Sequence, residues 1–390
     1  MPSKNIADHT ALILVSGQDK PGIMAGVMQV LTPFAIKILD IEQLIIRDRL
    51  ILTILISSDP DHSSAITADL AQFSKISELD IAVDFTAHKE TQTTSDTLIA
   101  VVIGESINAS SLSVIASEVA KLGGNIQSIR RTANYPVRAI ELQLSIPNQM
   151  FKQVQRQLAL VASANRIDLA VEKGGKARTL KRVVLLDMDS TLIEQEVIDL
   201  LARFAGHEVR VKELTEQAMR GEIDFRQALT ERVFLLKGLD ESIFDLIRKE
   251  LTLTSGAEKL ISELHRYGHK VGVVSGGFIN VIEPILKSLK IDFYQANTLE
   301  VKDGKMTGRL SGPIIDKTAK YEALKAFAQE FNVDIEQSVA IGDGANDIEM
   351  LQAAGLGIAF NAKPQVATAA DTILSGKDLS AVLLFLGISG

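Results

Sequence analysis

Short aliphatic runs that end in aspartate, serine or glycine recur through the second half of the chain. They read "RVVLLD" from Arg182, "KVGVVSGG" from Lys270 and "SVAIGDGAND" from Ser338, with long stretches of helical spacing between them. Continuous apolar runs of this kind are typical of parallel strands buried on both faces, and such sheets bind ligands at the carboxyl ends of their strands. The pattern therefore predicts an α/β domain with a central parallel sheet.

Two other features complete this half. The stretch from Glu194 to Glu250 has helical spacing and no strong strand, which predicts a helical insertion, or cap, at about residues 194–255. The stretch "LEVKDGKMTGRL" predicts a hairpin that turns at Asp303–Gly304.

The pattern of the first half predicts an internal repeat. Segments beginning at Ala11 and Ile99 each show a strand, a polar turn, a helix and two further strands, with a closing strand near "IAVDF" and again near "IDLAVE". In "LIIRDRLILTILIS" the charges at 47–49 divide the apolar run into two strands, so we do not expect a membrane span.

We therefore predict two small α+β domains, a linker and an α/β domain. The basic, glycine-containing stretch "KGGKAR" marks the linker. The predicted boundaries are 1–90, 91–172, 173–180 and 181–390.

Composition limits the possible partners. The net charge of −8 offers no basic footprint for nucleic acid. The absence of cysteine excludes disulfides and thiol chemistry and fits a reducing compartment. The N-terminal apolar run is too short for a signal peptide, so we expect a cytoplasmic protein without membrane contact.

Asp187 and Asp189 follow the first predicted strand of the α/β domain. Residues two apart on an extended chain point the same way, so one pocket can receive both carboxylates. Two such groups persist together if a divalent cation lies beside them or if one carries a proton. The spacing alone fits equally a polar loop in which Ser190 or Thr191 caps the next helix.

A second acidic cluster, "GDGAND", contains Asp343, Asn346 and Asp347. Clustered oxygen ligands suit a hard cation such as Mg²⁺ bound together with a substrate phosphate. A calcium loop of the EF-hand type is excluded, because the twelfth position counted from Asp343 is Ala354 where a glutamate is required. A glycine-rich turn without function stays open.

Ser275 and Lys320 lie between these clusters in the sequence. A hydroxyl with neighbouring backbone N–H groups can hold phosphoryl oxygens, and a lysine can neutralise their charge. Taken singly, Ser275 reads as a turn residue and Lys320 as a solvated helical lysine.

Together, the four stretches resemble the haloacid dehalogenase superfamily, whose fold is a Rossmann-like parallel sheet with a cap. "DMDSTLIEQEVIDLLA" and "GDGANDIEML" are similar to the phosphoserine phosphatase family in particular. The resemblance implies one Mg²⁺ per site and the following roles. Asp187 would be the nucleophile and Asp189 the general acid and base. The metal would be held by Asp187, Asp343 and the backbone carbonyl of Asp189. The phosphoryl group would be bound by Ser275, Gly276 and Lys320, and the loop would be supported by Asn346 and Asp347.

The resemblance also implies that the cap reads the substrate. Glu196 would meet an ammonium group and Arg232 would grip a carboxylate bidentately, with Met219 and Phe225 lining the cap. Taken singly, these are ordinary helix-end, surface and core residues. Their concurrence favours phosphoserine over a generic phosphate monoester.

The two N-terminal repeats resemble ACT domains, small ferredoxin-like modules that bind amino acids and pair across subunits. The first copy carries the family's strand-to-helix turn at Asp19–Gly22, whereas the second copy reads "INAS" there. This resemblance implies serine as an effector and a homodimer. A dimerisation scaffold without a ligand stays open as the alternative.

The predicted function is Mg²⁺-dependent hydrolysis of O-phospho-L-serine through an aspartyl-phosphate, the last step of serine biosynthesis. Hydrolysis of another small phosphomonoester is the nearest alternative, and a minor phosphotransferase activity is compatible with the same nucleophile. An amino-acid sensor with a lapsed catalytic fold is the alternative from another class. The clustered, mutually repelling carboxylates argue against a sensor.

Overall fold

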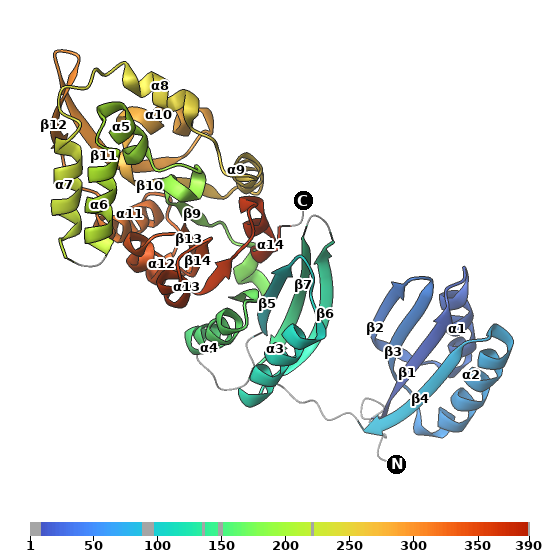
Figure 1. The fold of residues 1–390 in the computed structure, drawn as a ribbon. Helices are drawn as coiled ribbons and strands as arrows, with labels where there is room; N and C mark the ends of the chain where they lie inside the picture. Colours follow the sequence, from blue (N-terminus) through green and yellow to red (C-terminus); the bar gives the residue numbers. More distant parts are fainter. Residues whose placement is uncertain (1–8, 88–96, 135–136, 147–150, 220–221, 389–390) are drawn as a thin grey trace. The chain divides into compact units, whose positions relative to one another are not determined.

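The computed structural model describes residues 9–87, 97–134, 137–146, 151–219 and 222–388, apart from a few side chains at the segment ends. The chain divides into two compact units, residues 1–93 and 94–390 (Figure 1). The first unit holds the first repeat, and the second unit holds the second repeat together with the α/β domain.

The first unit is a four-stranded antiparallel sheet with helices on one face. Its strand order is β2-β3-β1-β4. Alternate side chains of β1, such as Ile13 and Val15, are buried under the helices, while Leu12 and Leu14 point away from them. The elements are β1 (His9–Gln18), α1 (Ile23–Leu31), β2 (Lys37–Ile46), β3 (Arg49–Ser57), α2 (Ser63–Ser77) and β4 (Asp80–Ala87).

The second repeat has the same topology, with strand order β6-β7-β5-β8. Its elements are β5 (Thr97–Gly104), α3 (Ala109–Lys121), β6 (Asn125–Ala133), β7 (Arg138–Ser145), α4 (Phe151–Ala164) and β8 (Asp168–Lys173). Both repeats thus have the ferredoxin-like fold expected from the sequence. Helices α2 and α4 were not among the predicted elements. The apolar spacing of α2 is weak, because Ile66 and Leu70 are the buried residues of this 15-residue helix.

The α/β domain contains a seven-stranded sheet of order β12-β11-β10-β9-β13-β14-β15. Neighbouring strands are parallel except for the β11–β12 hairpin, which turns at Asp303–Gly304 as predicted. The strands are β9 (Val183–Leu186), β10 (Lys270–Phe278), β11 (Phe293–Lys302), β12 (Lys305–Ser311), β13 (Ser338–Gly342), β14 (Leu356–Phe360) and β15 (Thr372–Leu374).

Helices cover this sheet and form the cap (Figure 1). Those of the sheet layer are α9 (Ala257–Arg266), α10 (Ile279–Ser288), α11 (Lys317–Glu330), α12 (Ile348–Ala353), α13 (Pro364–Ala369) and α14 (Val382–Phe385). Those of the cap are α5 (Val197–Ala205), α6 (Glu208–Met219), α7 (Phe225–Phe234) and α8 (Ile243–Glu250). In the described part of the chain, no helix is both long and apolar enough to cross a membrane.

Strand β9 sets the position of the site. It lies between β10 and β13, and its four residues are fully buried. The N–H of Asp187 donates to the carbonyl of Ile341 at 2.9 Å, so the ends of β9 and β13 stay paired where their acidic residues begin. The two clusters of the sequence therefore meet at one edge of the sheet.

The cap is joined to the sheet by two short antiparallel segments. Ile193 and Leu253 form an isolated bridge. The side chain of Gln195 donates to Thr252 Oγ1 at 3.2 Å and accepts from the backbone N–H of Thr252 at 2.9 Å. These contacts tie the entering and leaving strands of the cap together.

The second repeat packs directly on the α/β domain. Ile99, Val101 and Ile103 of β5 belong to the same hydrophobic core as β9 and β10. Lys152 Nζ donates to the carbonyls of Ala354 and Gly355 at 3.2 and 3.1 Å. Strand β5 is thus buried on both faces.

The segment predicted as a linker takes part in this junction. It contains a 3-10 helix, Gly175–Thr179. Arg178 Nη1 donates to Glu141 Oε2 at 2.5 Å and Nη2 to the carbonyl of Phe385 at 3.3 Å. The connection is therefore packed between the two domains.

Candidate active site

Asp187, at the end of β9, is buried and held by two donors. Its Oδ1 accepts from the N–H of Met188 at 2.8 Å and pairs with Lys320 Nζ at 2.6 Å. Burial, reinforced by the negative charge of Asp347, raises the pKa of Asp187 well above its usual range, while Lys320 acts in the opposite direction. Both of these contacts are made by Oδ1.

Asp189 follows in a tight turn closed by the bond from the N–H of Ile193 to the carbonyl of Met188 at 3.0 Å. Ser190 has a φ of 57°, which turns the chain sharply toward the cap. Among the described residues, no hydrogen-bond partner reaches the buried Oδ1 of Asp189. Burial and the charge of Glu196 raise the pKa of Asp189 well above its usual range. Asp189 can therefore hold a proton at neutral pH more readily than an ordinary carboxyl group does.

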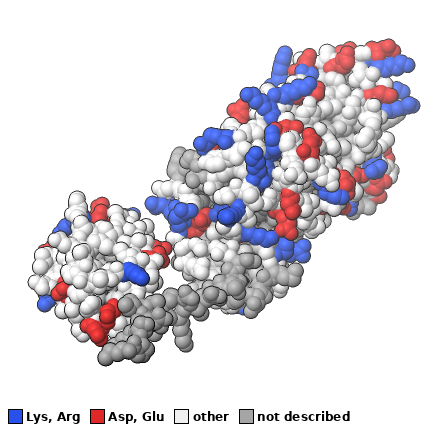
Figure 2. Space-filling model, turned by 180° about the vertical axis from the view of Figure 1, so that it is seen from behind, with Lys and Arg blue, Asp and Glu red and all other residues white. Residues whose placement is uncertain are grey.

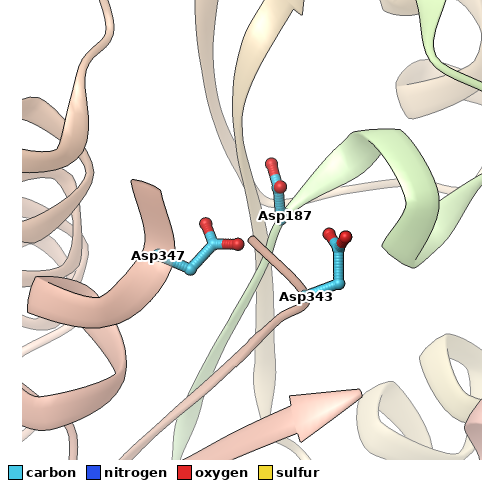
Figure 3. A group of neighbouring side chains, drawn as sticks. All are labelled: Asp187, Asp343 and Asp347. Carbon is cyan, nitrogen blue, oxygen red and sulfur yellow. The ribbon is translucent and has the colours of Figure 1, made fainter. Parts of the chain in front are cut away.

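Three carboxylates converge at this edge of the sheet. Asp187, Asp343 and Asp347 each offer an oxygen, and these oxygens lie within 4.8 Å of one another (Figure 3). Burial, with the charge of Asp347, raises the pKa of Asp343 to about 6. Thr191 Oγ1 donates to Asp343 Oδ1 at 3.2 Å, a contact that the sequence analysis did not predict.

Lys320 is the countercharge of this group. It lies on α11, is fully buried, and its Nζ is 2.6 Å from an oxygen of Asp187 and 2.6 Å from one of Asp347. Burial opposes the charge, but the two carboxylates outweigh it and raise the pKa of Lys320. Lys320 is thus a buried ion-pair partner rather than a solvated helical lysine.

This donor set fits a hard divalent cation. It consists of carboxylate oxygens, which Mg²⁺ prefers. The sequence prediction named Asp187, Asp343 and the backbone carbonyl of Asp189, and the side-chain cluster contains Asp347 as well. Both oxygens of Asp347 accept other bonds, from Lys320 and from the N–H of Gly344, so its first role is to hold Lys320 and the loop.

The C-terminal end of β10, where its pairing with β11 is irregular between Ser275 and Phe278, brings backbone groups to the same place. Ser275 is fully buried, and its Oγ accepts from the N–H of Gly277 at 2.8 Å. The side chain of Asn297 fixes this end of β10. Its Nδ2 donates to the carbonyl of Gly276 at 2.7 Å, and its Oδ1 accepts from the N–H of Ile315 at 2.9 Å. Asn297 was not among the predicted site residues; it is fully buried in β11, but an amide in a strand carries no local sequence signal of this role.

Gly277 is the second residue that the sequence analysis missed. A Cβ at this position would lie 2.9 Å from Asp189 Oδ2 and 3.0 Å from Ser275 Oγ. A Cβ at Gly276 would meet its nearest neighbour, Phe225 Cζ, at 3.8 Å. Gly277 is therefore the residue whose missing side chain makes room for Asp189.

The cap residues lie around the carboxylates as far as the structure describes them. Glu196 accepts from Ser190 Oγ at 2.8 Å and is exposed. Phe225 approaches Gly276, and Arg232 lies where the charges of Glu196 and Asp189 act on its guanidinium. The side chain of Met219 is outside the described residues. Asn346 approaches Gly344 of its own loop, and among the described residues no hydrogen bond of its side chain to the other predicted site residues is found.

The predicted effector turn belongs to the first unit. The N–H of Asp19 donates to the carbonyl of Asp48 at 2.8 Å. Gly22 has a φ of 95° and begins α1, a conformation that favours glycine. In the second repeat the corresponding turn is capped by Asn108, whose Oδ1 accepts from the N–H of Ser111 at 2.9 Å.

Comparison with known families agrees with this architecture. A model described as haloacid dehalogenase-like hydrolase matches residues 184–352, and two ACT domain models match residues 9–86 and 96–172. The fold and the carboxylate site thus define a haloacid dehalogenase-like hydrolase with two N-terminal ACT domains.

Individual relatives narrow the class. Phosphoserine phosphatase SerB2 of Mycobacterium tuberculosis is 42% identical over 391 residues, covering 100% of this chain and 95% of the relative. A phosphoserine phosphatase of Streptomyces coelicolor is 42% identical over 381 residues, covering 97% and 92%. A solved structure titled as a substrate-bound phosphoserine phosphatase complex is 44% identical, with a TM-score of 0.51, and covers 53% of this chain and 98% of its own. The chain belongs to the phosphoserine phosphatase family.

Proposed function

We propose that this chain hydrolyses O-phospho-L-serine to L-serine and phosphate, the last step of serine biosynthesis, in the cytoplasm. The observation that carries the proposal is the buried group of Asp187, Lys320 and Asp347, beside Asp189, whose Oδ1 has no hydrogen-bond partner among the described residues. The names of the full-length relatives support the substrate.

In the first step, a carboxylate oxygen of Asp187 attacks phosphorus. The new bond joins Asp187 to phosphorus as the bond from phosphorus to the serine oxygen breaks. Asp189 gives its proton to that oxygen, which would otherwise leave as a poor alkoxide. The raised pKa of Asp189 supports its role as the acid.

In the second step, water replaces Asp187 on phosphorus. Asp189, now a carboxylate, accepts a proton from the attacking water, and the bond from Asp187 to phosphorus breaks. Phosphate leaves, and Asp189 is protonated again. A solved relative with 44% identity and a TM-score of 0.50 is titled as a phospho-aspartyl intermediate analogue, which supports this route.

Mg²⁺ completes the proposal, with one ion held by Asp187, Asp343 and the backbone carbonyl of Asp189. When bound, the ion offsets the charge of the phosphoryl oxygens. Lys320, Ser275 and the N–H of Gly276 would bind the same oxygens, with Asn346 supporting them. Lys320 also screens the approach of an anionic phosphate to Asp187.

The cap would select phosphoserine among phosphomonoesters. In this proposal Glu196 receives the ammonium group, Arg232 receives the carboxylate, and Phe225 and Met219 line the space between them. The charges of Glu196 and Asp189 on Arg232 support a shared pocket.

Phosphate release from L-phosphoserine, beside phosphomonoesters that lack the amino or the carboxylate group, tests the proposal. We expect turnover that requires Mg²⁺, stops with excess chelator and strongly favours phosphoserine. Asp187→Asn should abolish it, because an amide cannot attack phosphorus as a carboxylate does. Equal turnover of all the esters would remove the substrate assignment, and full activity of the Asp187→Asn protein would remove the nucleophile.

We further propose that serine binds at the turn Asp19–Gly22 and restrains the enzyme. The space around Gly22 supports this proposal, since a Cβ there would meet no atom within 4 Å. We expect added serine to slow turnover of the full chain. Unchanged turnover together with an unchanged thermal midpoint would contradict the proposal.

A homodimer is the last part of the proposal, and the outer sheet face of the first unit supports it. Large apolar side chains that point away from the helices, or lie on the edge strand β2, are exposed there, which is unusual for a surface without a partner. They are Leu12, Leu14, Ile38, Leu39, Ile41, Leu44, Ile45, Ile46 and Ile51. On the face shown in Figure 2, this unit carries few charges, whereas both signs are scattered over the larger unit.

A further inference from the structure

Arg232, the residue proposed above to receive the substrate carboxylate, is held by the cap itself. Its Nη1 donates to Thr215 Oγ1 on the neighbouring helix α6 at 3.3 Å. Its Nε donates to the carbonyl of Ala228, one turn earlier on α7, at 3.3 Å. Two of the three guanidinium nitrogens are therefore engaged by the cap.

The hydroxyl of Thr215 is oriented to accept this bond. Thr215 Oγ1 donates its own proton to the carbonyl of Val211 at 2.9 Å. The oxygen lone pairs are then available to Arg232. Among the described residues, none accepts from Nη2 of Arg232, so that end of the guanidinium remains available to a ligand.

A carboxylate of the cap also attracts Arg232. Asp199, on α5, is the largest electrostatic partner of Arg232, ahead of Glu196 and Asp189. An arginine side chain is long and flexible, so without a fixed contact the attraction of Asp199 would act on the orientation of the guanidinium. The contact with Thr215 opposes that attraction and keeps the fork of the guanidinium in one orientation.

We propose that Thr215 is a positioning residue for substrate specificity, whose hydroxyl holds Arg232 so that its free edge accepts the carboxylate of an amino-acid phosphate. Bidentate binding of a carboxylate needs a fixed planar fork, which is why a small rotation of the guanidinium would be costly. The inference rests on the proposed function, in which Arg232 reads that carboxylate. Thr215 itself touches neither the phosphoryl group nor the reacting atoms in this assignment.

The test compares L-phosphoserine with phosphoethanolamine, which has the ammonium group but no carboxylate, in the full-length protein with Mg²⁺. Thr215→Val keeps the shape and removes the hydroxyl. We expect the KM for phosphoserine to rise roughly tenfold, as for loss of one hydrogen bond to a charged group. We expect a nearly unchanged kcat and no change in either constant for phosphoethanolamine.

Two further variants separate positioning from folding. Thr215→Ser keeps the hydroxyl and should restore the KM for phosphoserine. Thr230→Val is the matched control, because Thr230 on α7 makes the same bond to a carbonyl four residues earlier, that of Arg226 at 2.7 Å, on an exposed surface. Thr230→Val should leave KM and kcat unchanged for both substrates.

The possible results distinguish this inference from the proposed function. A wild-type protein that turns over both esters equally well overturns the substrate assignment and the inference with it, before any substitution is made. A wild-type preference that survives Thr215→Val overturns the role of Thr215 alone. Equal loss of both activities in Thr215→Val would show a structural role and also overturn the inference.

Discussion

Gly277 and Asp189 show how one missing side chain organises the site. Asp189 Oδ2 lies only 2.9 Å from the position that a Cβ of residue 277 would take, closer than a Cβ normally allows. The carboxyl group can therefore lie against the backbone at the end of β10, and among the described residues its buried Oδ1 has no hydrogen-bond partner. A side chain at position 277 would therefore displace the carboxyl group of Asp189, while Asp189 itself stays an aspartate.

We predict that Gly277→Ala lowers kcat by a factor of roughly 100, the low end of what a positioned general acid or base contributes. The added methyl group pushes Asp189 away from the leaving oxygen, while the backbone N–H is retained. Gly276→Ala is the matched control, because its Cβ has 3.8 Å of space. Steady-state kinetics on phosphoserine measures both, and equal effects of the two substitutions would contradict the steric argument.

The protonation of Asp343 links metal binding to pH. Burial raises its pKa to about 6, above the ordinary value of ~4. At pH values between about 4 and about 6, Asp343 therefore binds more protons in the folded, metal-free protein than in the unfolded chain. This contribution to stability is complete below about pH 4 and is lost as the pH rises through about 6.

A divalent cation binds the carboxylates in their charged form, so the stabilisation that it provides increases as the pH rises. We predict that Mg²⁺ raises the thermal midpoint more at pH 8 than at pH 5, with chelator as the reference. Asp343→Asn should remove most of that difference. A shift of equal size at both pH values would argue against a metal site that includes Asp343.

Helix α11 carries Lys320 into the carboxylate cluster, and its first residue is set by Asp316. Asp316 Oδ1 accepts from the N–H of Ala319 at 3.0 Å as an N-cap. Its Oδ2 pairs with Arg226 of cap helix α7, with Nη2 at 2.6 Å. One carboxylate thus both begins the helix and connects the cap to the sheet domain.

We predict that Asp316→Ala destabilises the protein by about 1 kcal/mol through loss of the N-cap. Asp316→Asn should cost less, since an asparagine oxygen still caps the helix and the exposed pair with Arg226 contributes little. Denaturant unfolding measures the difference. If the asparagine variant were as destabilised as the alanine variant, the ion pair and not the cap would be the main contribution.

At the scale of the whole molecule, the two ACT domains differ in what covers their outer sheet face. Val101 of β5 is 1% exposed within the core shared with the phosphatase domain, whereas Leu14, at the matching position of β1, is 43% exposed. The outer sheet face of the second ACT domain is thus buried within its unit, whereas the outer sheet face of the first ACT domain exposes apolar side chains.

We predict opposite consequences for one substitution at these two positions. Val101→Asp buries an unpaired charge and should lower the free energy of unfolding by about 3 kcal/mol or more. Leu14→Asp should change stability by less than about 1 kcal/mol but convert the proposed dimer to monomer. Thermal unfolding and analytical ultracentrifugation measure the two effects, and a Leu14→Asp protein that stays dimeric would exclude this face as the interface.

The strand ends were predictable because chain order and strand polarity place them. Asp187, Ser275 and Asp343 each follow an aliphatic run, and parallel strands bring such ends to one edge. Asn297 and Gly277 were not predictable, because an amide in a strand and a second glycine carry no local signal. Helix α2 was missed because its apolar spacing is weak.

The sequence by itself determined the fold class, the repeat and the carboxylate-rich strand ends, since periodicity and motif order are local properties of the chain. The tertiary structure decided which groups touch. Lys320 pairs with Asp187 and Asp347 across elements far apart in the chain. Thr215 and Arg232 meet because two cap helices pack together. Such contacts depend on the packing of whole elements, which no short stretch of sequence encodes.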